Sequence, residues 1–439
     1  MLAYCNTTDT PALFVAPRGG KTVVSCQWIA QKDFARVLVV APYPAFYGWM
    51  ENLRKINRKL IVLSGSGVQK SFQLYQSMTS SPRRVVLVNV EAHRILPELS
   101  EYQWDCVILD ESTRIKTATA AVSKYFVKHF DRVPYKMVLT GTPDAEGELD
   151  IFQQLRFLDR GILDCDNYYQ FQHRYCIKPF MSFRWEMTQR GRAFLAERLA
   201  RHCFTLESTQ MRITGELETT VATCVLDNSS RAVYDEIERL LVVKVDDEVL
   251  ARTLYSLVAF QWMRQLAGGI LPQKPNTAKL DLLRSLLTRR DGKFVVFCNY
   301  IDEILLVQKL LVEMGFQSRV IRGAVGIAER MSIQAQFVGG MLDAVVCQTS
   351  AIQWGADLAK ANTAYVYSCP LSRESYIQMQ SRILNTEKKA ISHLVLLAVE
   401  NTVDIDIIKS QERKERNHAR LTSLVAEIRR RVNCGNIDN

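Results

Sequence analysis

Two short segments in the first quarter of the chain carry residues that could bind and hydrolyse a nucleoside triphosphate. Gly19-Gly20-Lys21-Thr22 follows an apolar run and opens a predicted helix, Val23–Gln31, as a phosphate-binding loop does. Backbone N–H groups and the helix N-terminus would bind phosphates, Lys21 would reach the terminal phosphates and Thr22 would ligate Mg²⁺. Val15 stands where the full pattern has glycine or alanine, so a plain strand–helix turn is the alternative.

The second segment is the apolar run Val107-Ile108-Leu109, which ends in the adjacent carboxylates Asp110 and Glu111. Asp110 would hold Mg²⁺, directly or through water, and Glu111 would polarise the attacking water as general base. The alternative is a solvated acidic turn. Because the phosphate loop precedes this turn in the right order, the pair predicts a nucleoside-triphosphatase. A third segment, Leu139-Thr140-Gly141-Thr142-Pro143, narrows that prediction to a nucleic-acid motor.

The bulk properties fit this interpretation without requiring it. The 439 residues suffice for two or three domains, and 48% hydrophobic and 23% charged residues are ordinary for a soluble globular protein. The net charge of +10 is compatible with nucleic-acid binding and equally with a solvated basic surface. No apolar run approaches the roughly 20 residues of a membrane span. No secretion signal is evident at the N-terminus, so a cytoplasmic location without membrane association is expected.

The eleven cysteines do not indicate a metal site. They are scattered, and no Cys-x-x-Cys pair occurs, so zinc binding is disfavoured. Several lie in strand-like runs such as Phe294–Cys298, where cysteine behaves as a small buried apolar residue. Free thiols suit a reducing, intracellular compartment.

The elements that must position these residues follow an alternating pattern at both ends of the chain. Short apolar runs alternate with helical stretches, which is typical of a parallel sheet covered by helices. The strands predicted in the first part are Ala12–Ala16, Val37–Ala41, Leu60–Leu63, Val85–Val88, Cys106–Leu109 and Met137–Leu139. Those predicted in the second part are Phe294–Cys298, Ser318–Ile321, Ala344–Cys347, Thr363–Tyr367 and His393–Leu397.

The middle of the chain is predicted to be mostly helical, for example over Ser230–Leu241 and Glu248–Leu266, with a helix end at Gly268-Gly269. The residues from Asp404 to Val432 predict a charged amphipathic helix rich in Arg. We favour a solvated face over a phosphate-contacting arm for it. The predicted domains are an α/β lobe over 1–158, a mainly helical insertion and linker over 159–275, a second α/β lobe over 276–408 and a basic C-terminal helix over 409–439.

With these motifs in order, the chain resembles superfamily 2 helicase-like ATPases, from about Leu13 to Ile408. It looks most like the Swi/Snf-type double-stranded DNA translocases, particularly the compact forms common in bacteriophages. Asp110-Glu111-Ser112-Thr113-Arg114-Ile115-Lys116 resembles the family's extended acidic motif. The resemblance implies two RecA-like lobes with a helical insertion between them, and ATP and Mg²⁺ as cofactors.

The resemblance also implies roles for individual residues. Thr140, Gly141 and Thr142, with Gln378, would couple nucleotide state to DNA contacts, and Arg382 would be a catalytic residue. Gly355 and Asp357 would join residues 19–22 in binding ATP. Val37–Pro42, with Trp49 downstream, looks like the first DNA-contact motif, and Ile321-Arg322-Gly323, followed by Glu329-Arg330, like a later one. The residues expected to contact DNA are Pro42, Arg114, Lys116, Asn299, Arg322, Gly323 and Thr349.

The sequence departs from the family pattern in four places. No glutamine lies in the 11 residues before the first strand, although the family usually reads adenine with one upstream of the loop. Ile352-Gln353 replaces a Gly-Gly pair, and Ala324 replaces an acidic residue after Gly323. The fourth departure is Asn385, which occupies the position of the usual arginine finger, three residues after Arg382. Such a finger is worth roughly 10³–10⁵ in rate, so either Arg382 serves alone, or Lys388 or Lys389 substitutes, or the ATPase is weak. We expect weak but real hydrolysis, because Lys21, Asp110 and Glu111 are intact.

Together these features predict an ATP-dependent translocase on duplex or branched DNA, of the fork-remodelling or branch-migration type, with replication or recombination proteins as possible partners. If the chain derives from a phage, its location is the host cytoplasm. Two other hypotheses stay open. An ATP-gated DNA-binding module with little hydrolysis would follow from Asn385. A small-molecule kinase would share the phosphate loop, but it does not explain the Thr140–Thr142 segment or the second lobe.

Overall fold

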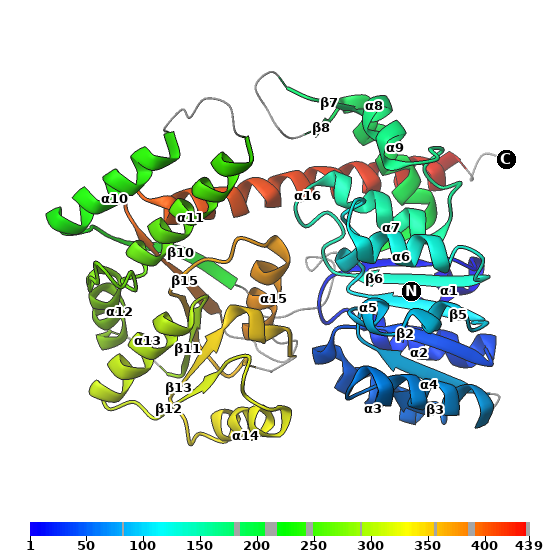
Figure 1. Ribbon diagram of the computed structural model, residues 1–439, viewed down its shortest axis with the longest axis horizontal. Coiled ribbons are helices and arrows are strands. Elements are labelled where there is room, and N and C mark those ends of the chain that lie inside the picture. Colours follow the sequence, from blue (N-terminus) through cyan, green and yellow to red (C-terminus); the bar gives the residue numbers. More distant parts are fainter. Residues whose placement is uncertain are drawn as a thin grey trace. The chain divides into compact units, whose positions relative to one another are not determined.

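The computed structural model describes residues 1–80, 83–179, 185–206, 217–242, 249–289, 292–354, 358–384 and 391–435. The chain divides into two compact units. Unit 1 comprises Met1–Met211 together with Lys414–Asn439, and unit 2 comprises Arg212–Arg413. Each unit holds one parallel sheet between layers of helices (Figure 1). The predicted α/β class, with two parallel-sheet lobes, is therefore confirmed.

The sheet of unit 1 has seven strands in the order β3-β4-β2-β5-β6-β1-β9, and all of its pairings are parallel. Its strands are β1 (Ala12–Val15), β2 (Arg36–Val40), β3 (Lys59–Val62), β4 (Arg84–Val88), β5 (Cys106–Asp110), β6 (Tyr135–Thr140) and β9 (Cys203–Leu206). A two-stranded antiparallel hairpin of β7 (Cys176–Ile177) and β8 (Glu186–Met187) lies apart from this sheet.

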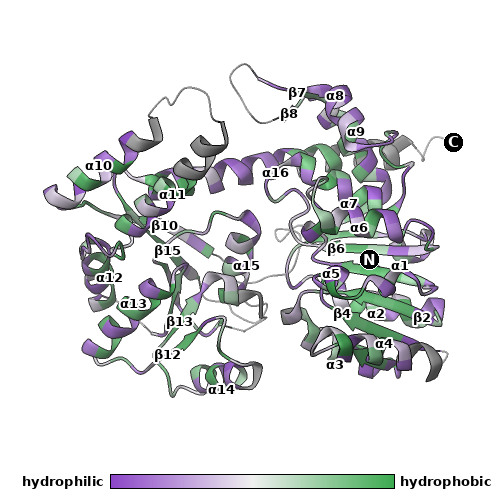
Figure 2. Cartoon of the chain, in the orientation of Figure 1, coloured by the Kyte–Doolittle hydropathy of each residue, from purple (hydrophilic) through white to green (hydrophobic). Residues whose placement is uncertain are grey.

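Alternate residues of these strands belong to two different cores. Leu13 and Val15 pack in one core with Trp28 and Trp49, whereas Ala12 and Phe14 pack in the other. A strand buried on both faces must be apolar throughout, which is why the uninterrupted apolar runs predicted strands (Figure 2). The first core is covered by α1 (Leu2–Thr7), α2 (Lys21–Lys32) and α3 (Phe46–Lys55), preceded by the 3₁₀ turn η1 (Tyr43–Ala45).

The opposite face of this sheet carries most of the remaining helices of unit 1. They are α4 (Gly67–Ser80), α5 (Ala92–Ile95), α6 (Ala121–His129), α7 (Ile151–Leu158), α8 (Tyr168–Tyr175) and α9 (Gln189–His202). The 3₁₀ turns among them are η2 (Pro97–Ser100), η3 (Ser112–Ile115) and η4 (Glu148–Asp150). The start of α9 is set by Thr188, whose hydroxyl accepts the Gly191 N–H at 3.0 Å as an N-cap.

The sheet of unit 2 has six parallel strands in the order β10-β15-β14-β11-β13-β12. They are β10 (Leu217–Cys224), β11 (Phe294–Cys298), β12 (Ser318–Ile321), β13 (Ala344–Gln348), β14 (Thr363–Val366) and β15 (Ser392–Val399). The helices of this unit are α10 (Asn228–Val242), α11 (Val249–Ala267), α12 (Ala278–Thr288), α13 (Ile301–Glu313), α14 (Ile327–Val338), η6 (Thr349–Trp354) and α15 (Arg373–Ile383). As predicted, α11 stops before Gly268-Gly269, where Gly269 adopts φ +75°.

Besides its helices, the middle of the chain contributes two strands to the parallel sheets, neither of which was predicted. β9 forms an edge of the unit 1 sheet beside β1, and β10 forms an edge of the unit 2 sheet beside β15. The β10 sequence, Leu-Glu-Thr-Thr-Val-Ala-Thr-Cys, is largely exposed, so it lacks the apolar run by which the other strands were recognised. The domain boundaries at residues 158, 275 and 408 stay predictions.

The final helix, α16 (Val403–Gly435), has the expected solvated face, on which Arg413, Arg416 and Arg420 are exposed, but other residues of the helix are buried. Ile407 and Ile408 pack in a core of unit 2, whereas Leu421 and Val425 are 4% and 2% exposed in a core of unit 1. Leu421 and Val425 are four residues apart and share one side of the helix, which is why both reach the same core. The second half of α16 is therefore an integral part of unit 1.

The cysteines and the helices bear on what the sequence predicts about thiols and membrane spans. Nine of the ten cysteines with described side chains are buried, and all ten are free thiols, as the strand positions indicated. Within the described ranges, no helix has the length and apolar character needed to cross a membrane.

Candidate active site

The phosphate loop leaves β1 and enters α2 through two residues with left-handed backbone conformation. Arg18 has φ +66° and Gly20 has φ +81°, and Gly20 is the N-cap of α2. The loop is closed by a hydrogen bond from the Gly19 N–H to the Ala16 carbonyl at 3.1 Å. Lys21 and Thr22 are the first two helical residues, so their N–H groups lie at a helix N-terminus. This arrangement fits a phosphate group, because unpaired N–H groups and the helix dipole both favour an anion.

Lys21 lies between the end of β1 and the acidic turn after β5. Its Nζ donates to the Val15 carbonyl at 2.6 Å and to the Ala16 carbonyl at 3.4 Å. Burial lowers the pKa of Lys21, and the nearby carboxylates of Glu111 and Asp110 oppose that shift. The three residues predicted to be catalytic in the first lobe are therefore close enough to interact electrostatically.

Asp110 is held by two hydrogen bonds. Its Oδ2 accepts the Trp49 indole N–H at 2.7 Å, and its Oδ1 accepts the backbone N–H of Glu111 at 3.0 Å. Burial raises the pKa of Asp110, while Trp49, Lys21 and the Glu111 N–H lower it. Trp49 itself is fully buried, so its indole has a fixed position from which it orients this carboxylate. Trp49 was expected as part of a DNA-contact motif, and no sequence pattern indicates this bond to Asp110.

Glu111 begins the 3₁₀ turn η3 with φ +50° and ψ +56°. This left-handed conformation is uncommon for a residue with a side chain, and such residues cluster at functional sites. Thr22 and Asp110 were predicted to ligate Mg²⁺. Among the described residues, no group of three or more His, Cys, Asp or Glu could hold a metal. The Asp110 carboxylate and the Thr22 hydroxyl offer oxygen ligands, the kind that Mg²⁺ takes together with water and substrate phosphates.

Residues 140–143, the Thr-Gly-Thr-Pro segment, begin at the last residue of β6, which lies between β5 and β1 in the sheet. Because parallel strands end at one edge, this segment lies between the acidic turn and the phosphate loop. The Thr140 hydroxyl accepts the Thr142 N–H at 3.1 Å. A Cβ at Gly141 would meet the Pro17 side chain at 2.9 Å, so glycine permits the close approach to the phosphate loop.

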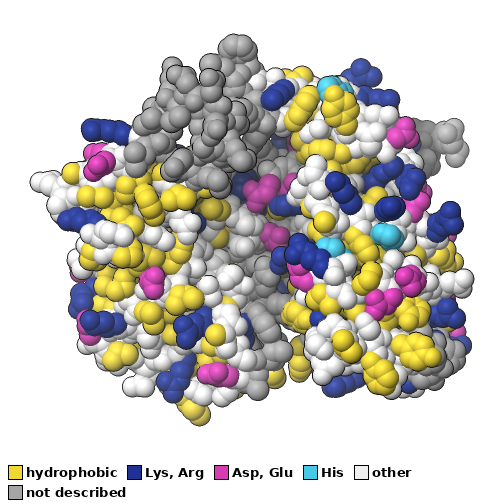
Figure 3. Space-filling model, viewed as in Figure 1, with side chains coloured by type: hydrophobic (Ala, Val, Ile, Leu, Met, Phe, Trp, Pro, Cys, Tyr) yellow, Lys and Arg dark blue, Asp and Glu magenta, His cyan; other side chains and the backbone are white. Residues whose placement is uncertain are grey.

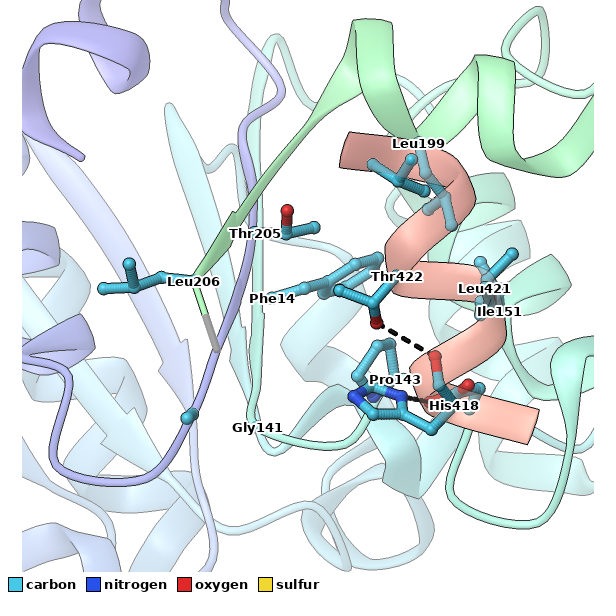
Figure 4. Close-up of a pocket in the computed structure, with 13 residues that line it drawn as sticks. Phe14, Gly141, Pro143, Ile151, Leu199, Thr205, Leu206, His418, Leu421 and Thr422 are labelled. Carbon is cyan, nitrogen blue, oxygen red and sulfur yellow. Dashed lines mark hydrogen bonds and ion pairs between the residues drawn. The ribbon is translucent and has the colours of Figure 1, made fainter. Parts of the chain in front are cut away.

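Four acidic residues at two-residue spacing follow this segment, and each pairs with a basic side chain, three with Lys or Arg and one with the His418 ring. The pairs are Asp144–His418 at 2.6 Å, Glu146–Lys414 at 2.5 Å, Glu148–Arg192 at 2.6 Å and Asp150–Lys116 at 3.4 Å. We call residues 144–150 the acidic ladder. Its partners come from α16, α9 and the end of the acidic motif, so one loop connects three parts of unit 1. Figure 4 shows His418 of α16 beside Pro143, in a pocket that both residues line.

Two residues of unit 1 that were expected to contact DNA have different surroundings. The Lys116 ammonium pairs with the Asp150 carboxylate, whereas Arg114 in η3 has an exposed side chain. Pro42 is the N-cap of η1, just beyond β2. Pro42 and the acidic turn follow adjacent parallel strands.

The candidate residues of unit 2 lie around the ends of its central strands. The Asn299 amide donates to the Ser368 carbonyl at 2.9 Å and the Cys369 carbonyl at 3.1 Å. The Thr349 hydroxyl donates to the Cys298 carbonyl at 3.0 Å. These side chains therefore organise backbone, and Thr349 is buried.

Arg330 shapes the turn that carries Arg322 and Gly323. Its guanidinium is buried and donates to the Arg322 carbonyl at 2.7 Å, the Gly323 carbonyl at 3.1 Å and the Ala351 carbonyl at 3.4 Å. One side chain thus joins this turn to η6, which begins at Thr349. Arg330 was expected only as part of a motif, and no role was predicted for its side chain.

Gln378 and Arg382 both lie on α15. Gln378 is buried, and its amide donates to the Glu374 carboxylate at 3.4 Å. Arg382 is half-buried, and its carbonyl accepts the Leu358 N–H at 3.1 Å. Gly355, Asp357 and Asn385 lie outside the described residues.

The distribution of charged side chains on the surface does not distinguish between the candidate functions. In Figure 3, Lys and Arg side chains are dispersed among hydrophobic and acidic ones on the visible face.

Two family models match this chain. The SNF2-related domain matches residues 18–268, and the helicase conserved C-terminal domain matches residues 278–386. The first match alone covers more than half of the chain, and it includes the phosphate loop, the acidic turn and residues 140–143.

Individual relatives match a smaller part. Chromodomain-helicase-DNA-binding protein 7 of Gallus gallus is 28% identical over 159 residues, which is 32% of this chain and 5% of that protein. RNA polymerase-associated protein RapA of Serratia proteamaculans (strain 568) is 27% identical over 152 residues, 32% of this chain and 16% of RapA. The matched region is therefore a small fraction of these relatives' length.

Among solved structures, the chain is similar to a Sulfolobus solfataricus SWI2/SNF2 ATPase core in complex with double-stranded DNA. The TM-score is 0.43 at 16% identity, with 98% of this chain and 92% of that chain covered. The likeness to compact bacteriophage members stays a prediction.

Proposed function

Because the chain belongs to the SNF2-related family of helicase-like ATPases, we propose that it is an ATP-driven translocase that moves on duplex or branched DNA. The observation that carries this proposal is the convergence of three motifs at one sheet edge. The phosphate loop, residues 140–143 and the acidic turn follow the neighbouring strands β1, β6 and β5. The proposed nucleotide site thus lies next to residues 140–143, the segment expected to couple nucleotide state to DNA contacts.

Mg²⁺-ATP, when bound, supplies the phosphoryl group whose transfer to water releases the driving energy. Lys21 and the N–H groups at the start of α2 would hold the phosphates, and Thr22 and Asp110 would hold the metal ion. Glu111 would accept the proton of the attacking water. Trp49 would keep Asp110 ionised, since its hydrogen bond lowers the pKa of that carboxyl group.

The DNA part of the proposal rests on the family and on charge. Pro42, Arg114, Arg322 and Gly323 lie in turns after strands, where contacts to phosphates carry no base sequence. The net charge of +10 favours such contacts. Strand separation is not required by these motifs, which is why fork remodelling or branch migration is the proposed activity.

The experiment that tests the proposal is ATP hydrolysis with no DNA, and with duplex, single-stranded and branched DNA. Lys21→Ala is the control, because it removes the phosphate-binding ammonium group. We expect turnover that DNA stimulates and that the variant loses, with the greatest stimulation by duplex or branched DNA. Turnover that no DNA stimulates would refute the translocase.

A second candidate is favoured by one specific residue. Asn385 occupies the position of the arginine finger and carries no charge. An ATP-gated DNA-binding protein would bind ATP and DNA tightly with almost no turnover. Under the first proposal, Asn385→Arg raises turnover; an Asn385→Arg protein no faster than its parent removes Asn385 as the explanation for weak activity.

A further inference from the structure

One buried amide is bonded to both the acidic motif and the Thr-Gly-Thr-Pro segment. Gln154 lies on α7 with a side chain that is fully buried. Its Nε2 donates to the Pro143 carbonyl at 2.7 Å and to the Asp150 carbonyl at 2.9 Å. Its Oε1 accepts the Ser112 hydroxyl at 2.7 Å.

Packing alone does not call for an amide at this position. Several residues of α7 around Gln154 are apolar and belong to the main core of unit 1, for example Ile151, Leu155 and Leu158. A leucine at residue 154 would suit such surroundings without the cost of desolvating a polar group. The buried Gln154–Ser112 pair is fully bonded, and such pairs fix one arrangement of the segments that they join.

Ser112 is the residue directly after Glu111, whose backbone holds the uncommon left-handed conformation. The Ser112 side chain is 1% exposed, and its hydroxyl is anchored to Gln154. Gln154 in turn is anchored to the backbone at Pro143 and Asp150. The turn that presents Glu111 is thus tied to the segment after β6, next to the phosphate loop.

We propose that Gln154 is a positioning residue for ATP hydrolysis, holding Ser112 and hence the Glu111 carboxylate in place relative to residues 140–143. Gln154 touches neither substrate nor metal ion and acts only through Ser112. The inference rests on the proposed role of Glu111 as general base. It concerns the rate of turnover, so ATP binding is left intact.

The test compares Gln154→Leu with Gln153→Leu in the full chain. Gln153 is the neighbouring residue, is 7% exposed, and makes one long hydrogen bond, to the Ala118 carbonyl at 3.4 Å. We expect Gln154→Leu to lower kcat roughly tenfold, the loss that about one hydrogen bond can cause, with the KM for ATP changed less than about twofold. Gln153→Leu should leave both constants close to those of the parent.

Two further variants keep the test decisive if Gln154→Leu does not fold. Ser112→Ala removes the hydroxyl while leaving the helix untouched, and it should lower kcat in the same way. Because both residues act through one bond, the double variant Ser112→Ala/Gln154→Leu should be no slower than the slower single variant. Losses that multiply instead, or a kcat for Ser112→Ala and any folded Gln154→Leu equal to that of Gln153→Leu, would overturn the inference.

Turnover without DNA separates this inference from the proposed function. Gln154 is judged on kcat in the absence of DNA, relative to the parent and to Gln153→Leu. The translocase proposal is judged on whether DNA stimulates the parent. Either can fail while the other stands.

Discussion

At the scale of single residues, the charge state of Asp110 depends on contacts that counteract the effect of burial on its pKa. Asp110 is desolvated, which raises its pKa, and its ionised form depends on the Trp49 indole, on Lys21 and on the Glu111 N–H. A carboxylate that binds Mg²⁺ must be charged. The Trp49 side chain, which donates this hydrogen bond, is therefore as much a part of the site as the Asp110 carboxylate.

Trp49→Phe removes that hydrogen bond while keeping an aromatic ring in the core. Since the bond lowers the Asp110 pKa, its loss raises that pKa, and the acidic limb of the kcat/KM profile should move to higher pH. A hydrogen bond to a charged group is worth about 1.5–3 kcal/mol, so the displacement should be large enough to measure. The measurement is the pH–rate profile of ATP hydrolysis.

Trp28→Phe is the matched control. Trp28 is also fully buried in the same core, and its indole nitrogen has no hydrogen-bond partner among the described residues. That variant should lose stability from packing but keep the parent's pH profile. An equal shift in both variants would show that the Trp49–Asp110 bond is not the cause.

At the scale of elements, the close approach of β6 to the phosphate loop depends on a missing side chain. Gly141→Ala places a Cβ 2.9 Å from the Pro17 side chain, at the entrance to the loop. We expect an overpacking cost of about 1–3 kcal/mol and a raised dissociation constant for ATP. Binding of a fluorescent ATP analogue and thermal unfolding measure the two effects.

Gly48→Ala provides the comparison, because a Cβ at Gly48 meets nothing within 4 Å. Gly48 lies in α3, where alanine should stabilise the helix by up to about 1 kcal/mol. ATP binding by that variant should match the parent. If Gly141→Ala bound ATP as tightly as Gly48→Ala, the contact with Pro17 would have no functional role.

The second half of α16 is the other element whose role emerges only in the fold. Leu421→Ala should destabilise the protein by about 2–5 kcal/mol, because it opens a cavity beside the sheet of unit 1. Ser423→Ala, an exposed change two residues away, should stay within about 0.5 kcal/mol of the parent. Denaturant unfolding measures both. Equal stability of the two variants would mean that α16 does not pack as described.

At the scale of the whole molecule, the net charge of +10 predicts how DNA binding depends on salt. For 6–10 phosphate contacts, the association constant should fall by roughly 10³–10⁵-fold between about 50 and 200 mM salt. Arg322→Ala removes one expected phosphate contact, so the slope of log K against log salt should become smaller in magnitude by about one. Fluorescence anisotropy with duplex DNA gives these slopes. A constant that does not change with salt would argue against phosphate-directed binding.

Local patterns revealed the site, and long-range contacts did not follow from them. The phosphate loop and the acidic turn each lie within a few consecutive residues, so their spacing alone identified them. The bonds Trp49–Asp110 and Ser112–Gln154 join residues 61 and 42 positions apart, and a single sequence carries no signal for such pairs.

The same limit applies to the fold. Apolar runs predicted the central strands because those strands are buried on both faces. The exposed edge strand β10 lacked such a run, and its pairing with β15 depends on residues about 175 positions away, from Leu217–Ser392 to Cys224–Val399. For α16, charge was the obvious property, yet Leu421 and Val425 decide where it packs.

The discontinuity of unit 1 has a consequence for how the protein is made. Residues 414–425 leave the ribosome after all of residues 212–413, although they complete the core begun by residues 1–211. A nascent chain therefore holds the first lobe unfinished, with apolar surface uncovered, throughout translation of the second. During that interval, the uncovered apolar surface of the first lobe is open to chaperones that bind apolar segments.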